Sequence, residues 1–226
     1  MAIAREGYDS FTAKTDPYNA SCTIPASTTC IVFAGAGYDT DGLASITLGS
    51  QTFSIDIDQV AAGGADCAYM AHLFSPSSTG AQTIAINWDS SRDYLAQMWF
   101  IYYSGTDTSS LRDTDSQQAA VPSTLTFTTQ SGDVVVCVAA LDSAATWTNA
   151  TEVVGVNNDS LYGTFAQCAA DGTSEQITVT DLNTGWGGIV LIPAAGGASS
   201  TPSSTLARGI AVGMFKGMGI GSGQYP

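Results

Sequence analysis

Residues 133–141 read DVVVCVAAL, and every side chain after the first is apolar. Two further runs are of the same kind, IVFAGA at residues 31–36 and MWFIYY at residues 98–103. A strand at the surface of a protein alternates apolar and polar residues, because successive side chains point to opposite faces of the sheet. A strand that is apolar on both faces is a central strand covered by a loop, a neighbouring sheet or another subunit. These three runs therefore predict the centre of a β-fold.

Shorter runs on either side of this centre do alternate, so one face of each is expected to be buried. The alternation is clearest in three pairs or triplets of apolar residues: Ile84, Ile86 and Trp88; Leu125 and Phe127; Ile177 and Val179. Turn-forming residues separate the runs, and Gly49 with Ser50 predicts a tight hairpin. The sequence thus predicts an all-β fold, a two-sheet antiparallel β-sandwich of the jelly-roll type.

The composition changes near residue 193. All twenty acidic residues and four of the six basic residues precede this point, which gives residues 1–193 a charge of −16. The last 33 residues have no acid and are rich in Gly and Ser. We therefore expect a β-sandwich domain at 1–193, a Gly/Ser/Pro linker at 194–205 and a Gly-rich C-terminal docking arm at 206–226.

The arm has glycines four residues apart at 209, 213, 217 and 221. This spacing would give a helix one bare face, but each glycine costs a helix about 1 kcal/mol, and the apolar run 209–220 is too short to span a bilayer. An extended arm in a groove of a neighbouring subunit fits better, because ordering such a chain needs compensating contacts. The expected partner-binding residues are Arg208, Ile210, Val212, Met214, Phe215, Lys216, Met218 and Ile220.

The net charge of −14 argues against sequence-independent binding to nucleic acid or to an anionic membrane, both of which require clustered Lys and Arg. The N-terminal sequence MAIAREGYDSF lacks the apolar core of a secretory signal, and no stretch approaches 18 apolar residues. We expect a protein made in a host cytoplasm without a signal peptide, which binds neither nucleic acid nor membrane.

The five cysteines are irregularly spaced, form no CxxC pair and accompany a single histidine, so a zinc site is not expected. Free thiols are the expectation, with Cys22 and Cys30 as the pair to bridge if a disulfide forms. Calcium is the one cofactor that the sequence leaves open. Two Asp-x-Asp pairs could supply oxygen ligands, although neither is followed by a glutamate at calcium-loop spacing; these weak metal candidates are Asp39, Asp41, Asp56 and Asp58.

No catalytic residue is predicted, and the chain is not expected to be an enzyme. His72 lies in an alternating run without a nucleophile in a recognisable elbow, which is typical of a hydrogen-bonded sheet histidine. Trp88 and Trp99 fall on predicted strands and are expected in the core. Trp147 is flanked by polar residues, so it is the candidate for contact with a ligand or partner.

Four segments carry a resemblance to a known module. They are the hairpin at 45–50, the strand pair at 69–88, the strand end at 104–107 and the GDVVV run at 132–136. Together they resemble a β-sandwich module, jelly-roll or immunoglobulin-like, that recurs in structural proteins of tailed phages and in bacterial surface proteins. The resemblance covers about residues 26–194, with Thr106 standing where the module has an aliphatic residue. It implies the sandwich fold and a role in assembly or adhesion.

The sequence therefore predicts a non-enzymatic virion structural protein. A capsid decoration or fibre subunit is expected, anchored to the particle through its C-terminal arm, with copies of itself and other virion proteins as partners. One alternative is a carbohydrate-binding, adhesive module that uses Trp147 and calcium to bind a glycan. The other is a subunit of an extracellular filament, which would polymerise as the isolated chain.

Overall fold

A computed structural model describes the chain at residues 1–13, 16–38, 42–59, 66–89, 96–119, 123–141, 143–144, 146–158, 161–180 and 184–195. The predicted docking arm, almost all of the linker, and the metal candidates Asp39 and Asp41 lie outside these residues. Regular structure in the described part is entirely β-strand, and every pair of adjacent strands in it is antiparallel. The all-β antiparallel sandwich predicted from the sequence is confirmed.

The first half of the chain forms two sheets. Sheet A has the strand order β1-β9-β3-β7-β6 and sheet B the order β2-β8-β4-β5. The pairs β1–β9, β2–β8, β3–β7 and β4–β5 are nested inside one another along the chain, which is the topology of a rolled-up hairpin, the jelly roll. The strands are β1 Ala4–Ala13, β2 Tyr18–Ile24, β3 Cys30–Tyr38, β4 Leu43–Leu48, β5 Gln51–Thr52, β6 Ser54–Gln59, β7 Asp66–Phe74, β8 Gly80–Trp88 and β9 Ala96–Ser104.

The second half repeats this topology. Sheet C has the order β10-β17-β12-β15-β14, which corresponds strand by strand to sheet A, and sheet D has the order β11-β16-β13, which corresponds to β2-β8-β4 of sheet B. The strands are β10 Thr106–Ala119, β11 Ser123–Thr128, β12 Val134–Leu141, β13 Thr146–Thr148, β14 Thr151–Asn158, β15 Leu161–Ala169, β16 Ser174–Thr180 and β17 Thr184–Pro193. The structure thus contains the predicted two-sheet sandwich twice.

The equivalence of the two sandwiches extends to a loop hydrogen bond. The Ser75 amide donates to the Thr29 carbonyl over 2.9 Å at the end of β7. At the equivalent place, the end of β15, the Ala170 amide donates to the Asp133 carbonyl, also over 2.9 Å. Matching strand order and matching loop contacts indicate two copies of one structural unit within the chain.

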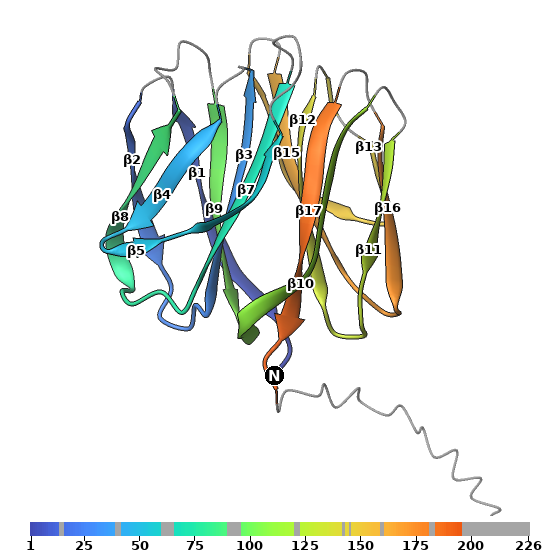
Figure 1. Cartoon of the computed structure of the whole chain (residues 1–226), viewed down its shortest axis with the longest axis horizontal. Helices are drawn as coiled ribbons and strands as arrows, with labels where there is room; N and C mark the ends of the chain where they lie inside the picture. Colours follow the sequence, from blue (N-terminus) through green and yellow to red (C-terminus); the bar gives the residue numbers. More distant parts are fainter. Residues whose placement is uncertain are drawn as a thin grey trace, which may run out of the picture.

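The four sheets stack as four layers in the order B, A, C, D, seen from left to right in Figure 1. Three apolar cores fill the spaces between them. The core between B and A includes Phe33, Ile84 and Ile86; the middle core between A and C includes Trp99 and Phe165; the core between C and D includes Phe127, Cys137, Ile177 and Trp186. Sheets A and C are therefore covered on both faces.

This layering explains the runs that are apolar on both faces. In β9 the side chains of Phe100 and Tyr102 enter the B/A core, while Trp99, Ile101 and Tyr103 enter the middle core. Eight of the nine residues of β9 and seven of the eight residues of β12 are buried. The sequence correctly predicted cover on both faces, and the structure assigns that cover to neighbouring sheets of the same chain.

The strands of the outer sheets alternate as predicted. Strand β11 has the burial pattern of strict alternation, with Leu125 and Phe127 buried between exposed threonines. The predicted hairpin is also present, with Gly49 at a φ of 59° between β4 and β5, a conformation that a glycine adopts without strain. Trp88 and Trp99 are in the core, at 4% and 0% exposure, as expected.

All five cysteines are free thiols. Cys22 lies in the core between sheets B and A, whereas Cys30 lies in the middle core between A and C. Sheet A separates the two side chains, so the Cys22–Cys30 bridge that the sequence left open is not formed. Burial raises the pKa of Cys22 to about 12 and also raises that of Cys30, as expected for unreactive interior thiols.

Candidate functional site

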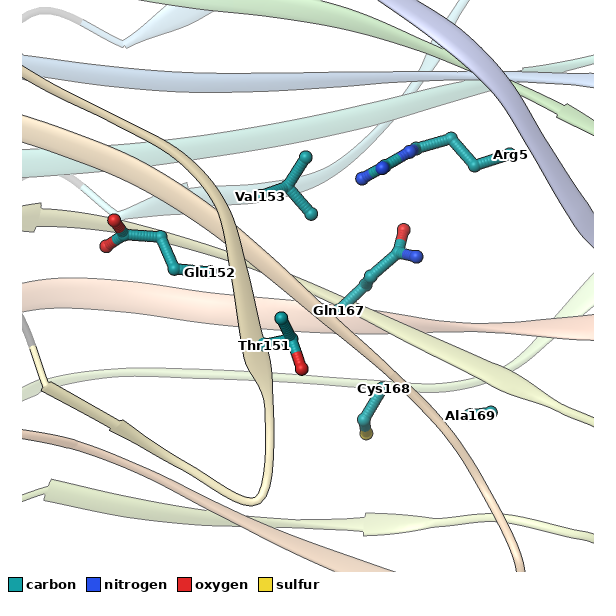
Figure 2. Close-up of a pocket in the computed structure, with 7 residues that line it drawn as sticks. All are labelled: Arg5, Thr151, Glu152, Val153, Gln167, Cys168 and Ala169. Atoms are coloured by element: carbon teal, nitrogen blue, oxygen red, sulfur yellow. The ribbon is translucent and has the colours of Figure 1, made fainter.

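A shallow notch of about 510 Å³ lies where the two sandwiches meet. Strand β14 starts opposite Gln167 of β15, so the last two residues of β15, Cys168 and Ala169, extend beyond it. Arg5 of β1, from the other sandwich, closes the notch from above. Figure 2 shows its guanidinium reaching across the seam toward Val153 and Gln167. The notch is therefore built from both halves of the chain.

A hydrogen bond across the seam fixes the floor of the notch. The Tyr103 hydroxyl, in the first sandwich, donates to the Gln167 side-chain oxygen over 3.0 Å. Burial raises the pKa of this hydroxyl, and the nearby Arg5 guanidinium opposes part of that rise. Tyr103 is thus a neutral donor at neutral pH, and Gln167 is held with its amide in the seam.

Glu152 forms the far wall of the notch. Its carboxylate accepts a hydrogen bond of 2.9 Å from the buried Thr164 hydroxyl and a longer one, 3.2 Å, from the Tyr162 hydroxyl. Arg5, by contrast, has no ion-pair partner among the residues that the structure describes. The notch consequently offers one guanidinium without an ion-pair partner among the described residues, whereas the Glu152 carboxylate is held by Thr164 and Tyr162 on the side of β14 away from Arg5 (Figure 2).

His72 is a sheet histidine with a structural partner, as the sequence suggested. Its Nδ1 lies 2.8 Å from Asp56 Oδ2, and its ring lies 4.4 Å from the Phe74 ring. Within the described residues, no serine or threonine hydroxyl and no cysteine thiol forms a hydrogen bond with this pair. The partly buried pair links β6 to β7. Among the described residues it has no nucleophile in hydrogen-bond contact, as a catalytic dyad would require.

The two metal candidates that the structure describes do not converge. Asp56 is engaged by His72, whereas Asp58 Oδ1 accepts the Leu43 amide over 3.2 Å on the other side of β6. Asp58 instead lies near Asp89, since a side chain placed on Gly42 would touch both carboxylates. No group of three or more His, Cys, Asp or Glu side chains within the described ranges is arranged to hold a metal ion. Calcium binding stays a prediction.

Asp58 should make the stability of the protein depend on pH. Asp58 is an exposed residue, but partial desolvation of its carboxyl, together with repulsion from Asp89, raises its pKa above 3.8, although the Leu43 amide opposes the change. A carboxyl with a raised folded-state pKa favours the folded state in acid, and this contribution is lost as the pH rises through the raised value. We therefore expect Asp58→Asn to be more stable than the parent protein at pH 7, with the difference vanishing near pH 3.

Urea unfolding of Asp58→Asn and its parent across pH 3 to 7 would measure this effect. The asparagine keeps an oxygen that can accept the Leu43 amide, so the substitution isolates the charge. Asp171→Asn is the control, because that exposed carboxylate, unlike the one of Asp58, accepts no hydrogen bond from the residues that the structure describes. Parallel stability curves for Asp58→Asn and the parent would contradict the proposed desolvation of the charge.

Trp147, the candidate ligand contact, is half-buried on the edge of the C/D core. Its ring stands edge-on to the Trp186 ring, with centroids 5.9 Å apart at an interplanar angle of 78°. Its indole nitrogen is buried without a hydrogen-bond partner. This packing orients the ring as a part of the core rather than as an open stacking platform, and a role in ligand contact stays a prediction.

No sequence pattern predicted the notch. Its residues come from positions 5, 151–153 and 167–169, and each is an ordinary strand residue in its local context. The predicted partner-binding residues from Arg208 to Ile220 lie outside the described residues, so the structure does not place them. Among the described elements there is no helix with the length and apolar character needed to cross a membrane.

Comparison with known proteins gave no match to a family model, to a curated protein or to a solved structure.

Proposed function

We propose that this chain is a non-enzymatic structural protein of a virion, a capsid decoration or fibre subunit attached through its C-terminal arm. The double sandwich would be the displayed body, and the acid-free arm would join it to the particle. The resemblance to a phage structural module and the contrast between body and arm in the sequence support this proposal. Its main support in the structure is the way in which the arm is rooted.

The segment that leads to the arm begins at Ala194, where hydrogen bonds join three parts of the chain. The Ala194 amide, just after β17, donates to the Gly105 carbonyl over 2.8 Å at the junction of the two sandwiches. The N-terminal ammonium of Met1 lies 3.5 Å from the Ala194 carbonyl. Figure 1 shows this junction at the lower end of the molecule, between the two sandwiches. A segment that leaves a rigid body at such a point is well placed to tether it.

The outer faces of the stack also suit a displayed body. The exposed side chains of β2 are Asn19, Ser21 and Thr23, and those of β11 are Thr124, Thr126 and Thr128. Hydroxyl and amide groups thus cover these strands, with no charge on their outward faces. Neutral hydroxyl-rich faces remain hydrated and do not attract charged partners non-specifically.

Removal of residues 196–226 tests the proposal. We expect the full-length chain to form an oligomer and the truncated chain to remain a folded monomer, because the truncation leaves every described strand intact. Light scattering would give the sizes, and circular dichroism with thermal unfolding would confirm the fold of the truncated chain. A truncated chain with the same oligomeric state as the full-length chain would contradict the role of the arm.

The same samples with and without EDTA would test for calcium, which the acidic residues near Gly42 leave as an open question. The carbohydrate-binding alternative makes a different prediction. It requires glycan affinity that is lost in Trp147→Ala and that survives deletion of the arm. An extracellular filament subunit would instead polymerise without any other protein.

A further inference from the structure

The edge strand β14 lacks the charges that protect the other edges of the inner sheets. Unpaired strand edges are normally guarded by charged residues and bulges, since they otherwise accept a further strand. The edge strands β1, β6 and β10 carry at least two acidic residues each, whereas β14 has one, Glu152. Val153, Val154 and Val156 of β14 are half-buried and pack against the middle core. All four edge strands contain a register shift, so it is in charge alone that this edge is the least protected of the four.

An exposed aromatic ring extends this apolar edge across the seam. Tyr8 of β1 is 39% exposed, and its ring stands edge-on to the Phe165 ring at 5.4 Å. Phe165 is paired with Val154 in the sheet. Tyr8 and the three valines therefore form a strip, with the notch beside Arg5 at one end of it. We call these four residues the seam strip.

The C-terminal arm has a pattern that matches such an edge. In residues 209–220, GIAVGMFKGMGI, large side chains occupy the even positions, and glycine or alanine occupies every odd position except 215. As an extended strand this segment would present one face of large, mainly apolar side chains and one nearly bare face. The period of two agrees with a strand better than the four-residue glycine spacing agrees with a helix.

The length of the arm permits the contact. The arm is rooted beside Gly105, next to the start of β1, where Ala4 pairs with Ser104. The 31 residues after Ala195 can span up to about 100 Å when extended, enough to reach another copy. The arm is acid-free with two cations, and the strip is bordered by Glu152 on β14 and by Arg5 on β1.

We propose that residues 209–220 of one copy add to the free edge of β14 in a second copy, as a sixth strand of its sheet C. The even-numbered side chains Ile210, Val212 and Met214 pack on the seam strip, and main-chain hydrogen bonds to β14 supply the rest of the contact. This inference rests on the proposed function, because it names the surface on which the arm docks.

Disulfide trapping between two differently labelled chains tests the proposal. One chain carries Thr151→Cys, an exposed position in the notch, and the other carries Ile210→Cys, Val212→Cys or Met214→Cys in turn. Both chains also carry Cys168→Ser, because Cys168 lines the same notch and would compete for the disulfide. The other four native thiols are buried in the cores. The control partner is Thr126→Cys, on the exposed outer face of sheet D.

After mild oxidation we expect a covalent heterodimer on a non-reducing gel for at least one arm position, at ten times or more the yield with Thr126→Cys. Yields equal to the control at all three positions would overturn the proposal. So would a chain carrying both cysteines that closes the disulfide only within itself.

Light scattering of the same full-length chains before oxidation separates this result from the proposed function. An arm-dependent oligomer without trapping at Thr151→Cys would refute the docking surface and leave the assembly role intact. Equal sizes of full-length and truncated chains would instead refute the assembly role, and the docking surface with it.

Discussion

Replacement of Asp133 by alanine is expected to lower the free energy of unfolding by about 3–5 kcal/mol, the usual cost of breaking a buried ion pair by removing one partner. Asp133 is 0% exposed and forms a bidentate ion pair with Arg112, which is itself partly buried. The Arg112 Nη2 donates to Asp133 Oδ1 over 3.2 Å, and its Nε donates to Oδ2. The Gln130 amide donates to the same Oδ2 over 2.7 Å.

This large effect is expected because the carboxylate ties the edge strand β10, through Arg112, to the turn before β12, through the Gln130 amide. The Asp133 carbonyl also accepts the Ala170 amide after β15, a main-chain bond that the substitution leaves in place. Alanine would leave the Arg112 guanidinium and the Gln130 amide without their acceptor in a region from which water is largely excluded. The tether between β10 and the rest of the second sandwich would be lost.

Urea denaturation at neutral pH would measure the loss. Asp171→Ala is the matched control, because Asp171 is an exposed acid in the neighbouring loop and its substitution should change stability by no more than about 0.5 kcal/mol. Asp133→Asn should fall between the two, since it keeps an acceptor for Gln130 but loses the charge. Equal stabilities for Asp133→Ala and Asp171→Ala would show that the pair contributes nothing.

Replacement of Gly163 by leucine is expected to force the two sandwiches apart. A Cβ at this position of β15 would lie 3.0 Å from Ala36 Cβ and from Trp99 Cη2, and 2.6 Å from Gln97 Oε1. All three neighbours belong to sheet A and are fully buried. They cannot move without disturbing the packing of β3 and β9, so glycine is required here by the close approach of sheets A and C.

Overpacking of a core usually costs about 1–3 kcal/mol and occasionally more, and we expect a value at or above the upper end. Gly172→Leu is the matched control, since nothing lies within 4 Å of a Cβ placed there and Gly172 has no positive φ. Chemical denaturation of both variants would give the difference. A Gly163→Leu variant as stable as Gly172→Leu would mean that sheets A and C do not pack in the way described.

Much of the fold could be predicted from the sequence because local patterns report burial directly. The alternation in β11 and β16 identified their buried faces, and the Gly49 turn identified a hairpin. Strands β1, β2, β10 and β13 were missed, and for β1 and β10 the reason is in their local sequence. Both are edge strands with polar sequences, AREGYDSFTA and TDTSSLRDTDSQQA, and both contain register shifts that break any alternation. They are strands because β9 and β17 supply pairing partners, and no local pattern shows this.

The candidate site was less predictable than the fold. Asp133 follows a glycine in a turn-like sequence and looks like an ordinary loop acid, yet it is the buried partner of an arginine 21 residues away. Arg5 and Gln167 have no sequence relation at all, and only the seam between two sandwiches brings them together. Acidic pairs such as Asp56 and Asp58 attract attention in a sequence, but the bulge in β6 and their separate partners keep them apart.

The sequence by itself determined that this chain is an antiparallel β-protein with central strands buried on both faces, because side-chain period and apolar content depend on local residues alone. Only the tertiary structure decided what covers those faces. A run such as MWFIYY is equally compatible with a loop, a sheet or another subunit above it. The cover is a second, equivalent sandwich. Each sandwich is closed by pairings between strands far apart in the chain, such as β1 with β9, and Gly163 lets sheets A and C pack against each other.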